Sequence, residues 1–299
     1  ANVTGRLGDV DLNAEVRQLL RNTMIEVNPE TVLLGESTND AASDLQGDGW
    51  HGAMTYPSFT RPLWAWLCEP TGEPYLNAEG EELTEPWFFG QPIGGIPRYT
   101  AADFVGAVTR FTASIPWRVR LGNMQPLDTH DTARFATNAG PGTIPLAVGL
   151  SMTMPGLPVV FAGDEFGLVG VDGEASRTPM PWDADAQAGF TTGEPWLPIP
   201  TEHRAQAVSR QELDPASTLN ATRGFLRWRK TLSALQWGSI EFLDAPEPVL
   251  VFTRHHADQS LLVAFNLSAN AVQWEIPDGL QLKELQGHGL LSGEVRDGN

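Results

Sequence analysis

Two carboxylate side chains stand at the ends of two separate strand-like segments. Glu36 follows the apolar run 31–35 and precedes a polar stretch, and Asp131 ends a second short segment, 127–131, much later in the chain. Cleavage of a glycosidic bond needs one carboxylic acid that protonates the leaving oxygen, and carboxylates that stabilise the developing positive charge. Glu36 and Asp131 are therefore candidates for acid catalysis on a sugar.

Each of these carboxylates also has a purely structural explanation. Glu36 could pair with a basic residue at the rim of the domain, and Asp131 lies beside His130 and three residues before Arg134, which allows an ion pair. Asp164 follows another apolar segment, and we favour a structural role for it. No two histidines are spaced as ligands on one element, so no metal site is predicted. A serine-hydrolase motif, Gly-x-Ser-x-Gly, is also absent from the sequence.

Apolar strand-like runs alternate with loops and amphipathic helices along most of the chain. Strands are predicted at 31–35, 54–59, 124–129 and 157–161, and helices at about 11–24, 61–67, 100–115, 143–154 and 214–235. The apolar stripe predicted on the first helix consists of Leu12, Val16, Leu19, Leu20 and Met24. Asp11 or Asn13 is expected to cap this helix, and Asp214 the last one. Thr100 and Asp103 have the spacing of a capping box.

Strand, loop and helix repeated about four times is typical of a (β/α) barrel, in which the chemistry sits where strands end. From about Gly238 the pattern changes to short strands, predicted at 249–252, 260–265 and 271–276. We therefore predict an α/β fold: half of a TIM barrel over residues 1–236, then a small all-β, sandwich-like domain over residues 237–299. Because the chain opens on Ala1 and stops in a turn-like sequence, we expect a fragment whose last domain is truncated.

The composition argues against several classes of partner. The formal net charge is −18 and the pI is about 4.6, so nucleic acid and anionic membranes, which attract basic patches, are not expected. Residues 144–163 carry no charge, but prolines interrupt them, so a buried helix, a turn and a buried strand explain them better than a membrane span. Cys68 is the only cysteine, which rules out an intramolecular disulfide. We expect a cytoplasmic rather than a secreted protein.

Four motifs occur in a fixed order along the chain. They are Leu33-Leu-Gly-Glu36, Leu127-Asp-Thr-His-Asp131, Pro155-Gly-Leu-Pro-Val-Val-Phe-Ala-Gly-Asp-Glu165 and Arg177-Thr-Pro-Met-Pro-Trp-Asp183. Together they resemble the second half of an α-amylase superfamily enzyme, glycoside hydrolase family 13, from residue 1 to about 235, and the tail resembles the C-terminal domain of that family. The resemblance implies a retaining enzyme on a (β/α)8 barrel, of which this chain supplies about strands 5–8.

The resemblance also implies roles for individual residues. Glu36 resembles the general acid/base at the end of the fifth strand, and Asp131 resembles the carboxylate after the seventh strand that stabilises the transition state. His130 resembles the neighbour that hydrogen-bonds the sugar, and Arg134 is predicted as a further substrate-binding residue. A general acid must keep its proton near neutral pH, so we expect Glu36 to lie partly desolvated and near like charge.

Two features depart from the family pattern. The nucleophile of the family is an Asp within a Gly-x-Arg-x-Asp motif that this sequence lacks, and residues 1–6 resemble the stretch just after it, which would place the nucleophile two residues before Ala1. Retaining hydrolysis needs that covalent step, so this chain is predicted to be inactive by itself. Thr129 stands where the family often has Asn. No cofactor is predicted, and the calcium site common in relatives would lie in the missing N-terminal half.

Other stretches indicate the kind of parent enzyme. Asn2, Val3, the segment 188–198 and the helix that begins near Asp214 resemble exo-acting α-glucosidases, which hydrolyse α-glucosidic bonds in short malto- or isomalto-oligosaccharides. A cyclomaltodextrinase or neopullulanase, a trehalose synthase-type glucosyl transferase and a non-catalytic carbohydrate-binding or transporter-associated relative remain as alternatives. No oligomeric state is predicted. Four tryptophans could stack on sugars, although core packing explains most of them better: Trp50, Trp64, Trp66 and Trp87.

Overall fold

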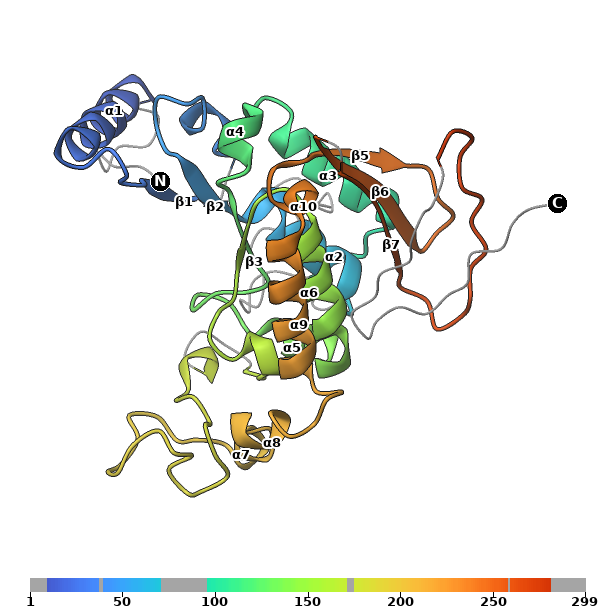
Figure 1. Ribbon diagram of the computed structural model, residues 1–299. Coiled ribbons are helices and arrows are strands. Elements are labelled where there is room, and N and C mark those ends of the chain that lie inside the picture. Colours follow the sequence, from blue (N-terminus) through green and yellow to red (C-terminus); the bar gives the residue numbers. More distant parts are fainter. Residues whose placement is uncertain (1–9, 38–39, 71–95, 171–174, 258, 281–299) are drawn as a thin grey trace, which may run out of the picture.

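The computed structural model describes residues 10–37, 40–70, 96–170, 175–257 and 259–280 (Figure 1). The helices are α1 (Val10–Val27), α2 (Thr60–Leu67), α3 (Ala101–Thr112), α4 (Trp117–Arg120), α5 (Phe135–Ala139), α6 (Ile144–Thr153), α7 (Thr201–Ala205), α8 (Val208–Gln211), α9 (Thr218–Thr231) and α10 (Ser233–Trp237). The strands are β1 (Leu34–Ser37), β2 (Gly52–Thr55), β3 (Met124–Pro126), β4 (Leu157–Val159), β5 (Ser239–Leu243), β6 (Val249–His256) and β7 (Gln259–Asn266). The predicted features at residues 1–6, at Trp87 and at the C-terminal end lie outside the described residues.

Strands β1 to β4 form a parallel sheet in which the spatial order of the strands follows their order along the chain. Helices α2 to α4 lie between β2 and β3 in the sequence, and α5 and α6 lie between β3 and β4. Parallel neighbours joined by helical crossovers are the β/α pattern that the sequence predicted. The α/β class is therefore confirmed, whereas the number of each strand within a complete barrel stays a prediction.

Strand β1 lies further along the chain than the predicted run 31–35. It spans Leu34–Ser37, so Glu36 lies inside the strand rather than after it. Gly35 is required here, because a Cβ atom at this position would lie 2.0 Å from the indole of Trp50. The buried Trp50 side chain therefore packs directly on the backbone of β1, next to the candidate acid.

The helices on the sheet share one main core. α3 begins with the predicted capping box, in which the side chains of Thr100 and Asp103 each accept the other residue's backbone N–H. α6 is buried along most of its length and packs on α9, where a Cβ atom at Gly149 would lie 3.1 Å from Phe225; the two helices run side by side in Figure 1. The uncharged stretch 144–163 forms the predicted buried helix, a turn and a short strand. The strand was predicted to be buried, but in the structure Leu157 is exposed and the rest of β4 is only partly buried.

Helix α1 contacts the rest of the chain through a polar face, which corrects the predicted apolar one. Asn13 and Arg17 are buried, and Arg17 forms an ion pair with Asp44 while its guanidinium lies over the ring of Trp50. The helix begins at Val10, so Asn13 lies within it rather than at its cap. The segment under the helix presents a carboxylate and backbone carbonyls, so the polar face is the one that packs. Three residues of the predicted stripe are exposed: Leu12, Leu19 and Leu20.

The long segment between β4 and α9 contains more structure than the loop that its glycines and prolines predict. α7 and α8 lie within it, and in Figure 1 it extends below the sheet in yellow. α9 is capped by Ser217, whose Oγ accepts the N–H of Asn220 at 3.2 Å. The predicted cap, Asp214, instead accepts the N–H of Ala216 at 2.9 Å in the preceding turn. The helix therefore begins a turn later than predicted.

The C-terminal part forms an antiparallel sheet in the order β5-β6-β7. β5 was not predicted. The strand expected at 271–276 was wrong, because that segment is irregular in the structure, and β5 is the third strand of the sheet instead. Trp274 holds that segment against the turn after β5, since its Nε1 donates to the carbonyl of Asp244 at 2.9 Å. Leu250 and Phe252 of β6 belong to the main core, so the two sheets share apolar packing.

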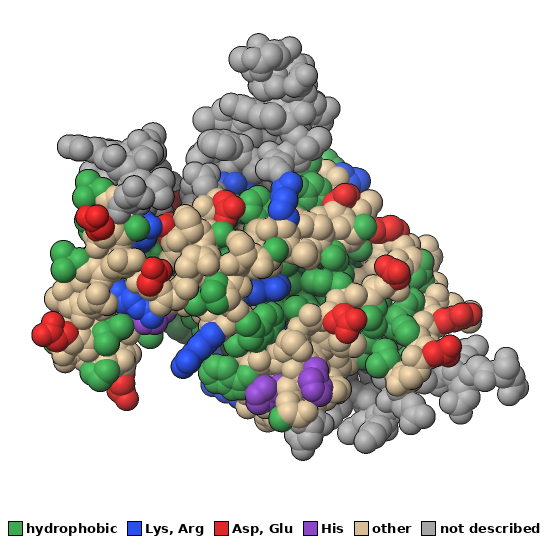
Figure 2. All heavy atoms as spheres, turned by 90° about the horizontal axis from the view of Figure 1, so that it is seen from above, with side chains coloured by type: hydrophobic (Ala, Val, Ile, Leu, Met, Phe, Trp, Pro, Cys, Tyr) green, Lys and Arg blue, Asp and Glu red, His purple; other side chains and the backbone are tan. Residues whose placement is uncertain are grey.

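Within the part of the chain that the structure describes, no helix combines the length and the apolar character needed to cross a membrane. Figure 2 shows the molecule from above, relative to the view in Figure 1. On this face, acidic and basic side chains are interspersed among hydrophobic ones, and no continuous basic area is visible.

Candidate active site

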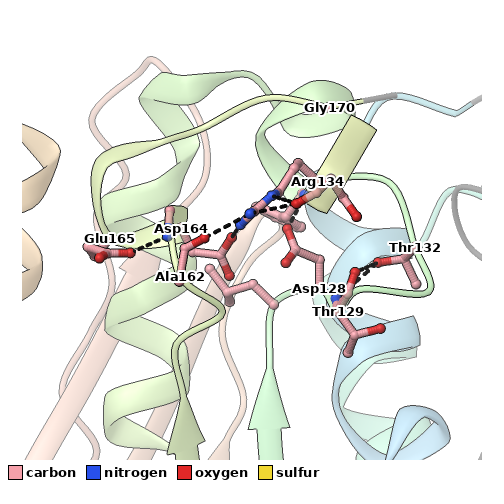
Figure 3. A network of polar contacts seen from close by, with 12 residues as sticks. Asp128, Thr129, Thr132, Arg134, Ala162, Asp164, Glu165 and Gly170 are labelled. Atoms are coloured by element: carbon pink, nitrogen blue, oxygen red, sulfur yellow. Dashed lines mark hydrogen bonds and ion pairs between the residues drawn. The ribbon is translucent and has the colours of Figure 1, made fainter. Parts of the chain in front are cut away.

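The carboxyl ends of β1 to β4 carry the residues that the sequence singled out. Because these strands are parallel, their ends lie along one edge of the sheet. Glu36 lies near the end of β1, His130 and Asp131 lie in the turn after β3, and Asp164 follows β4. The structure thus brings residues from three strands to a common edge, part of which Figure 3 shows.

The side chain of Glu36 is exposed, which differs from the partial desolvation that we expected. β1 is an edge strand that pairs only with β2 among the described residues. Side chains stand roughly perpendicular to a sheet, so the exposure of Glu36 means that no described residue covers its face of β1 at this position. In this structure the position of Glu36 at the carboxyl edge is as predicted, but its environment is not.

Asp131 makes contacts with two basic side chains. Its Oδ1 lies 3.3 Å from Nε2 of His130 and 3.2 Å from Nη2 of Arg177. Arg177 also donates from Nε to the carbonyl of His130 at 3.0 Å. Asp131 is 53% exposed, so these contacts orient the carboxylate without closing it off. Sequence reasoning gave Arg177 no role, although this residue opens the fourth motif.

Tyr56 is a second residue that sequence reasoning missed. It lies at the carboxyl end of β2, and its hydroxyl is 3.1 Å from Oγ1 of Thr129. Burial raises the pKa of Tyr56, the hydrogen bond with Thr129 opposes the rise, the charges of Glu36 and Asp131 add to it, and Arg61 opposes it. The charges of both candidate carboxylates therefore raise the pKa of the same phenol.

Arg134 lies beneath this surface rather than on it. Its side chain is 2% exposed, and Nη1 lies 2.9 Å from Oδ1 of Asp164. Nη2 donates to the carbonyls of Ala162 at 2.7 Å and Ser176 at 2.8 Å, and the guanidinium lies 4.0 Å from the ring centre of Phe161 (Figure 3). This geometry corrects the prediction of a sugar contact, because the guanidinium is occupied by the scaffold. Arg134 joins the turn after β3 to the loop after β4.

Asp128 and Asp164 form a buried carboxyl pair on either side of Arg134 (Figure 3). Burial raises the pKa of both groups; the charge of Asp128 adds to the rise at Asp164, and Arg134 opposes it at both. One oxygen of each carboxyl, Oδ1 of Asp128 and Oδ2 of Asp164, has no hydrogen-bond donor among the described residues. Two close carboxyl groups cannot both ionise readily, so we expect them to share a proton. The structural role that we favoured for Asp164 agrees with this burial.

The tryptophans divide between core and undescribed residues. Trp50, Trp64 and Trp66 are buried, so packing rather than sugar stacking explains them, and Trp87 lies outside the described residues. Among the residues that the structure describes, no group of three or more His, Cys, Asp or Glu is placed to hold a metal ion. The absence of a cofactor stays a prediction.

Two carboxylates and an exposed histidine thus lie at the carboxyl edge of a parallel β/α sheet, which is where β/α barrels carry their chemistry. The sequence model of the α-amylase catalytic domain matches residues 73–238, more than half of the chain, and that of the maltogenic amylase C-terminal domain matches residues 240–293. The chain therefore belongs to the α-amylase family. Asp131 lies within the matched range, whereas Glu36 precedes it.

Several relatives match stretches of the chain. A probable α-glucosidase of Rhizobium meliloti is 41% identical over 124 residues, which are 42% of this chain and 22% of that protein. An oligo-1,6-glucosidase of Heyndrickxia coagulans is 36% identical over 104 residues, which are 34% of this chain and 19% of that protein. A 4-α-glucanotransferase of Thermotoga maritima is 32% identical over 161 residues, 52% of this chain and 36% of that protein.

Among solved structures, the α-glucosyl transfer enzyme XgtA superposes with a TM-score of 0.67 and is 29% identical. The superposition covers 88% of this chain and 49% of that enzyme, so the chain spans about half of its length.

Proposed function

We propose that this chain is the carboxyl-terminal portion of a retaining α-glucosidase that acts on short malto- or isomalto-oligosaccharides. The observation that carries the proposal is that Glu36 and Asp131 lie at the carboxyl edge of one parallel sheet, in a chain that belongs to the α-amylase family. The names of the relatives support an α-glucosidic substrate. In this proposal, β1 to β4 are strands 5–8 of a complete barrel, and the barrel ends near residue 236.

Each residue has a defined task in this reaction. Glu36 protonates the glycosidic oxygen and later accepts a proton from water. Asp131 places a fixed negative charge where the oxocarbenium-like transition state develops positive charge, so it stabilises that state more than the neutral substrate. Arg177 holds Asp131 in place, and the exposed His130 is free to hydrogen-bond a sugar hydroxyl. Arg134 contributes by supporting the turn rather than by touching the sugar.

The covalent step of a retaining enzyme needs a third carboxylate as nucleophile. Residues 1–299 contain no Gly-x-Arg-x-Asp motif, so the proposal assigns the nucleophile to another part of the protein and implies that this chain alone does not hydrolyse glycosides. The enzyme acts on an oligosaccharide in the cytoplasm. This half of it binds no cofactor, and any calcium site lies in the other half.

Glucosyl transfer is the second candidate, and two comparisons favour it. The glucanotransferase of Thermotoga maritima matches 52% of the chain, and the superposed enzyme XgtA is named for α-glucosyl transfer. The carboxylates serve both reactions equally, because hydrolysis and transfer differ only in whether water or a sugar hydroxyl attacks the glycosyl-enzyme. A cyclomaltodextrinase or neopullulanase activity and a non-catalytic sugar-binding role are weaker alternatives.

The test uses the full-length protein with maltose, isomaltose and starch as substrates. Glu36→Gln should lower kcat by roughly 10²- to 10⁴-fold, because it removes the proton donor. Glu26→Gln, at an exposed position of α1, is the matched control and should leave the rate unchanged. Undiminished activity of Glu36→Gln would show that Glu36 is not the acid.

Two further measurements separate the candidates. Products of maltose that are longer than the substrate indicate transfer, whereas glucose alone indicates hydrolysis. Sugar binding without turnover, together with a non-carboxylate residue two positions before Ala1 in the full reading frame, would favour the non-catalytic relative.

A further inference from the structure

We propose that Tyr56 and Thr129 act as a positioning pair that fixes the backbone of Asp131 through the hydroxyl of Thr129. The inference rests on the proposed function of Asp131. It concerns residues to which neither the four motifs nor the comparisons give a role, and it starts from a set of hydrogen bonds that meet at the carboxyl edge of β2 and β3.

The first bond joins two neighbouring strands of the sheet. Tyr56 follows β2, Thr129 follows β3, and the two hydroxyl oxygens are 3.1 Å apart in a buried environment. The residues are 73 positions apart in the sequence, so this contact ties the turn after β3 to the end of a different strand. A hydroxyl–hydroxyl bond at this distance is directional and needs one oxygen to donate.

The second bond carries this constraint to Asp131. Oγ1 of Thr129 accepts the backbone N–H of Asp131 at 3.2 Å. A threonine hydroxyl can accept two bonds and donate one, so the same oxygen can serve Tyr56 and Asp131 together. Because the branched Thr side chain is restricted at χ1, its oxygen is held at a fixed position relative to the turn.

The third set of bonds closes the turn itself. The N–H of Thr129 donates to Oγ1 of Thr132 at 3.1 Å, and the N–H of Thr132 donates to the carbonyl of Thr129 at 3.2 Å (Figure 3). The single proton of the Thr132 hydroxyl has two carbonyl acceptors within reach, Ala133 at 2.9 Å and Thr129 at 3.2 Å. The turn is therefore rigid within itself, and Tyr56 is the contact that fixes it to β2. Without Thr129 the carboxylate of Asp131 would keep its basic neighbours but lose this anchor.

The charges around Tyr56 keep it suited to this task. Burial and the carboxylates of Glu36 and Asp131 raise the pKa of the phenol, against the opposing effects of Thr129 and Arg61. The phenol therefore stays protonated and neutral at physiological pH, where a phenolate would repel Asp131. A neutral hydroxyl can bond to Thr129 next to two carboxylates without adding negative charge.

The test compares variants of the full-length protein. Thr129→Val keeps the branched shape but removes the hydroxyl, and we expect kcat to fall by about 10- to 100-fold with little change in KM, because a small displacement of Asp131 weakens stabilisation of the transition state. Thr129→Ser restores the hydroxyl and should recover most of the rate. A merely structural role for Thr129 would predict no such rescue.

A double variant tests whether Tyr56 acts through Thr129. Tyr56→Phe alone should lower kcat, but in the Thr129→Val background it should have no further effect, because the contact has already been lost. Additive losses would overturn the pairing. If wild-type protein shows no glycosidase or transfer activity, the proposed function fails instead, and the two failures are thereby distinguished.

A spectroscopic readout is independent of activity. Titration of absorbance near 295 nm in the wild type and in Tyr56→Phe should differ by one late-ionising phenol, because burial raises the pKa of Tyr56. Asp131→Asn should shift that phenol to lower pH, since the charge of Asp131 raises its pKa. An unshifted titration would show that the two groups are too far apart for the proposed pair.

Discussion

The two ends of the parallel sheet both bury arginine, but they neutralise its charge in different ways. At the carboxyl end, Arg134 lies between two buried carboxyl groups, Asp128 and Asp164. At the amino end, next to the C-terminal sheet, Arg229 and Arg254 bond only to backbone carbonyls among the described residues. The first arrangement can take up or release a proton, and the second cannot.

The carbonyls at the amino end belong to chain segments where helices finish. Arg254 donates to Thr153, the last residue of α6, and to Leu235 and Gly238 at the end of α10, while Arg229 donates to Met152. Helix ends leave carbonyls without intrahelical partners and carry partial negative charge. Burial, followed by the charges of Arg229 and Arg120, lowers the pKa of Arg254 to about 9, so it remains charged at neutral pH.

The difference separates a functional end from a structural end. Titratable carboxyls lie beneath the edge that carries Asp131, where the chemistry is proposed. Backbone carbonyls, which cannot titrate, accept from Arg254 where β6 packs near the ends of α6 and α10. These contacts hold the two sheets together. The variants below test this contrast, in order of decreasing expected effect.

Arg134→Met should have the largest effect on stability. It leaves two buried carboxyls without their cation, and breaking a buried ion pair in this way costs roughly 3–5 kcal/mol at pH 7. Urea denaturation followed by tryptophan fluorescence would measure the free energy of unfolding. The loss should shrink at pH 5, where the carboxyls are protonated, and a loss independent of pH would contradict the comparison.

Arg254→Met should destabilise by about 2–4 kcal/mol, because several buried carbonyls lose a charged donor while the repulsion from Arg229 is relieved. This loss should be the same at pH 5 and pH 7, since no carboxyl accepts these bonds. Arg223→Met, which removes only the exposed pair with Glu212, is the matched control and should change stability by less than about 1 kcal/mol.

Asp164→Asn should be tolerated to within about 1 kcal/mol at pH 7, because an amide can accept from Arg134 and donate to Asp128 as a protonated carboxyl does. Its signature is the pH dependence of unfolding. Since the pKa of Asp164 is raised on folding, the native state binds more protons than the unfolded one above about pH 4. The protonated Asp164 carboxyl favours the native state. Its contribution to the free energy of unfolding is complete below the pKa that Asp164 has in the unfolded chain, and it is lost as the pH rises through the pKa in the folded chain. Wild-type stability should therefore fall relative to the variant as the pH rises, and parallel curves would exclude the shared proton.

Arg177→Ala should change stability least, by under about 1 kcal/mol, because Arg177 and Asp131 are both about half exposed and their ion pair is screened by water. Its effect should appear in kcat instead, which we expect to fall about tenfold as Asp131 loses one of its orienting contacts. Equal kcat in the variant and the wild type of the full-length protein would remove Arg177 from the site.

Local patterns in the sequence predicted the parts of the fold that depend on neighbours along the chain. The capping box at Thr100 and Asp103 and the buried helix α6 are of this kind. Prediction failed where a distant segment decides the outcome. The predicted packing face of α1 was wrong because Asp44, in a later segment, pairs with Arg17. The start of α9 was missed for a local reason, since Ser217 rather than Asp214 provides the cap.

The sequence by itself determined the family and placed Glu36, His130 and Asp131 at strand ends, because four short motifs in order specify which residue types follow which strands. Only the tertiary structure decided that Arg134 is buried and that Tyr56 reaches Thr129. A motif records the order and identity of residues, but burial and hydrogen bonding depend on segments that folding brings together from far apart. For that reason Arg134, three residues from Asp131, proved to be part of the scaffold, whereas Tyr56, on another strand, lies at the site.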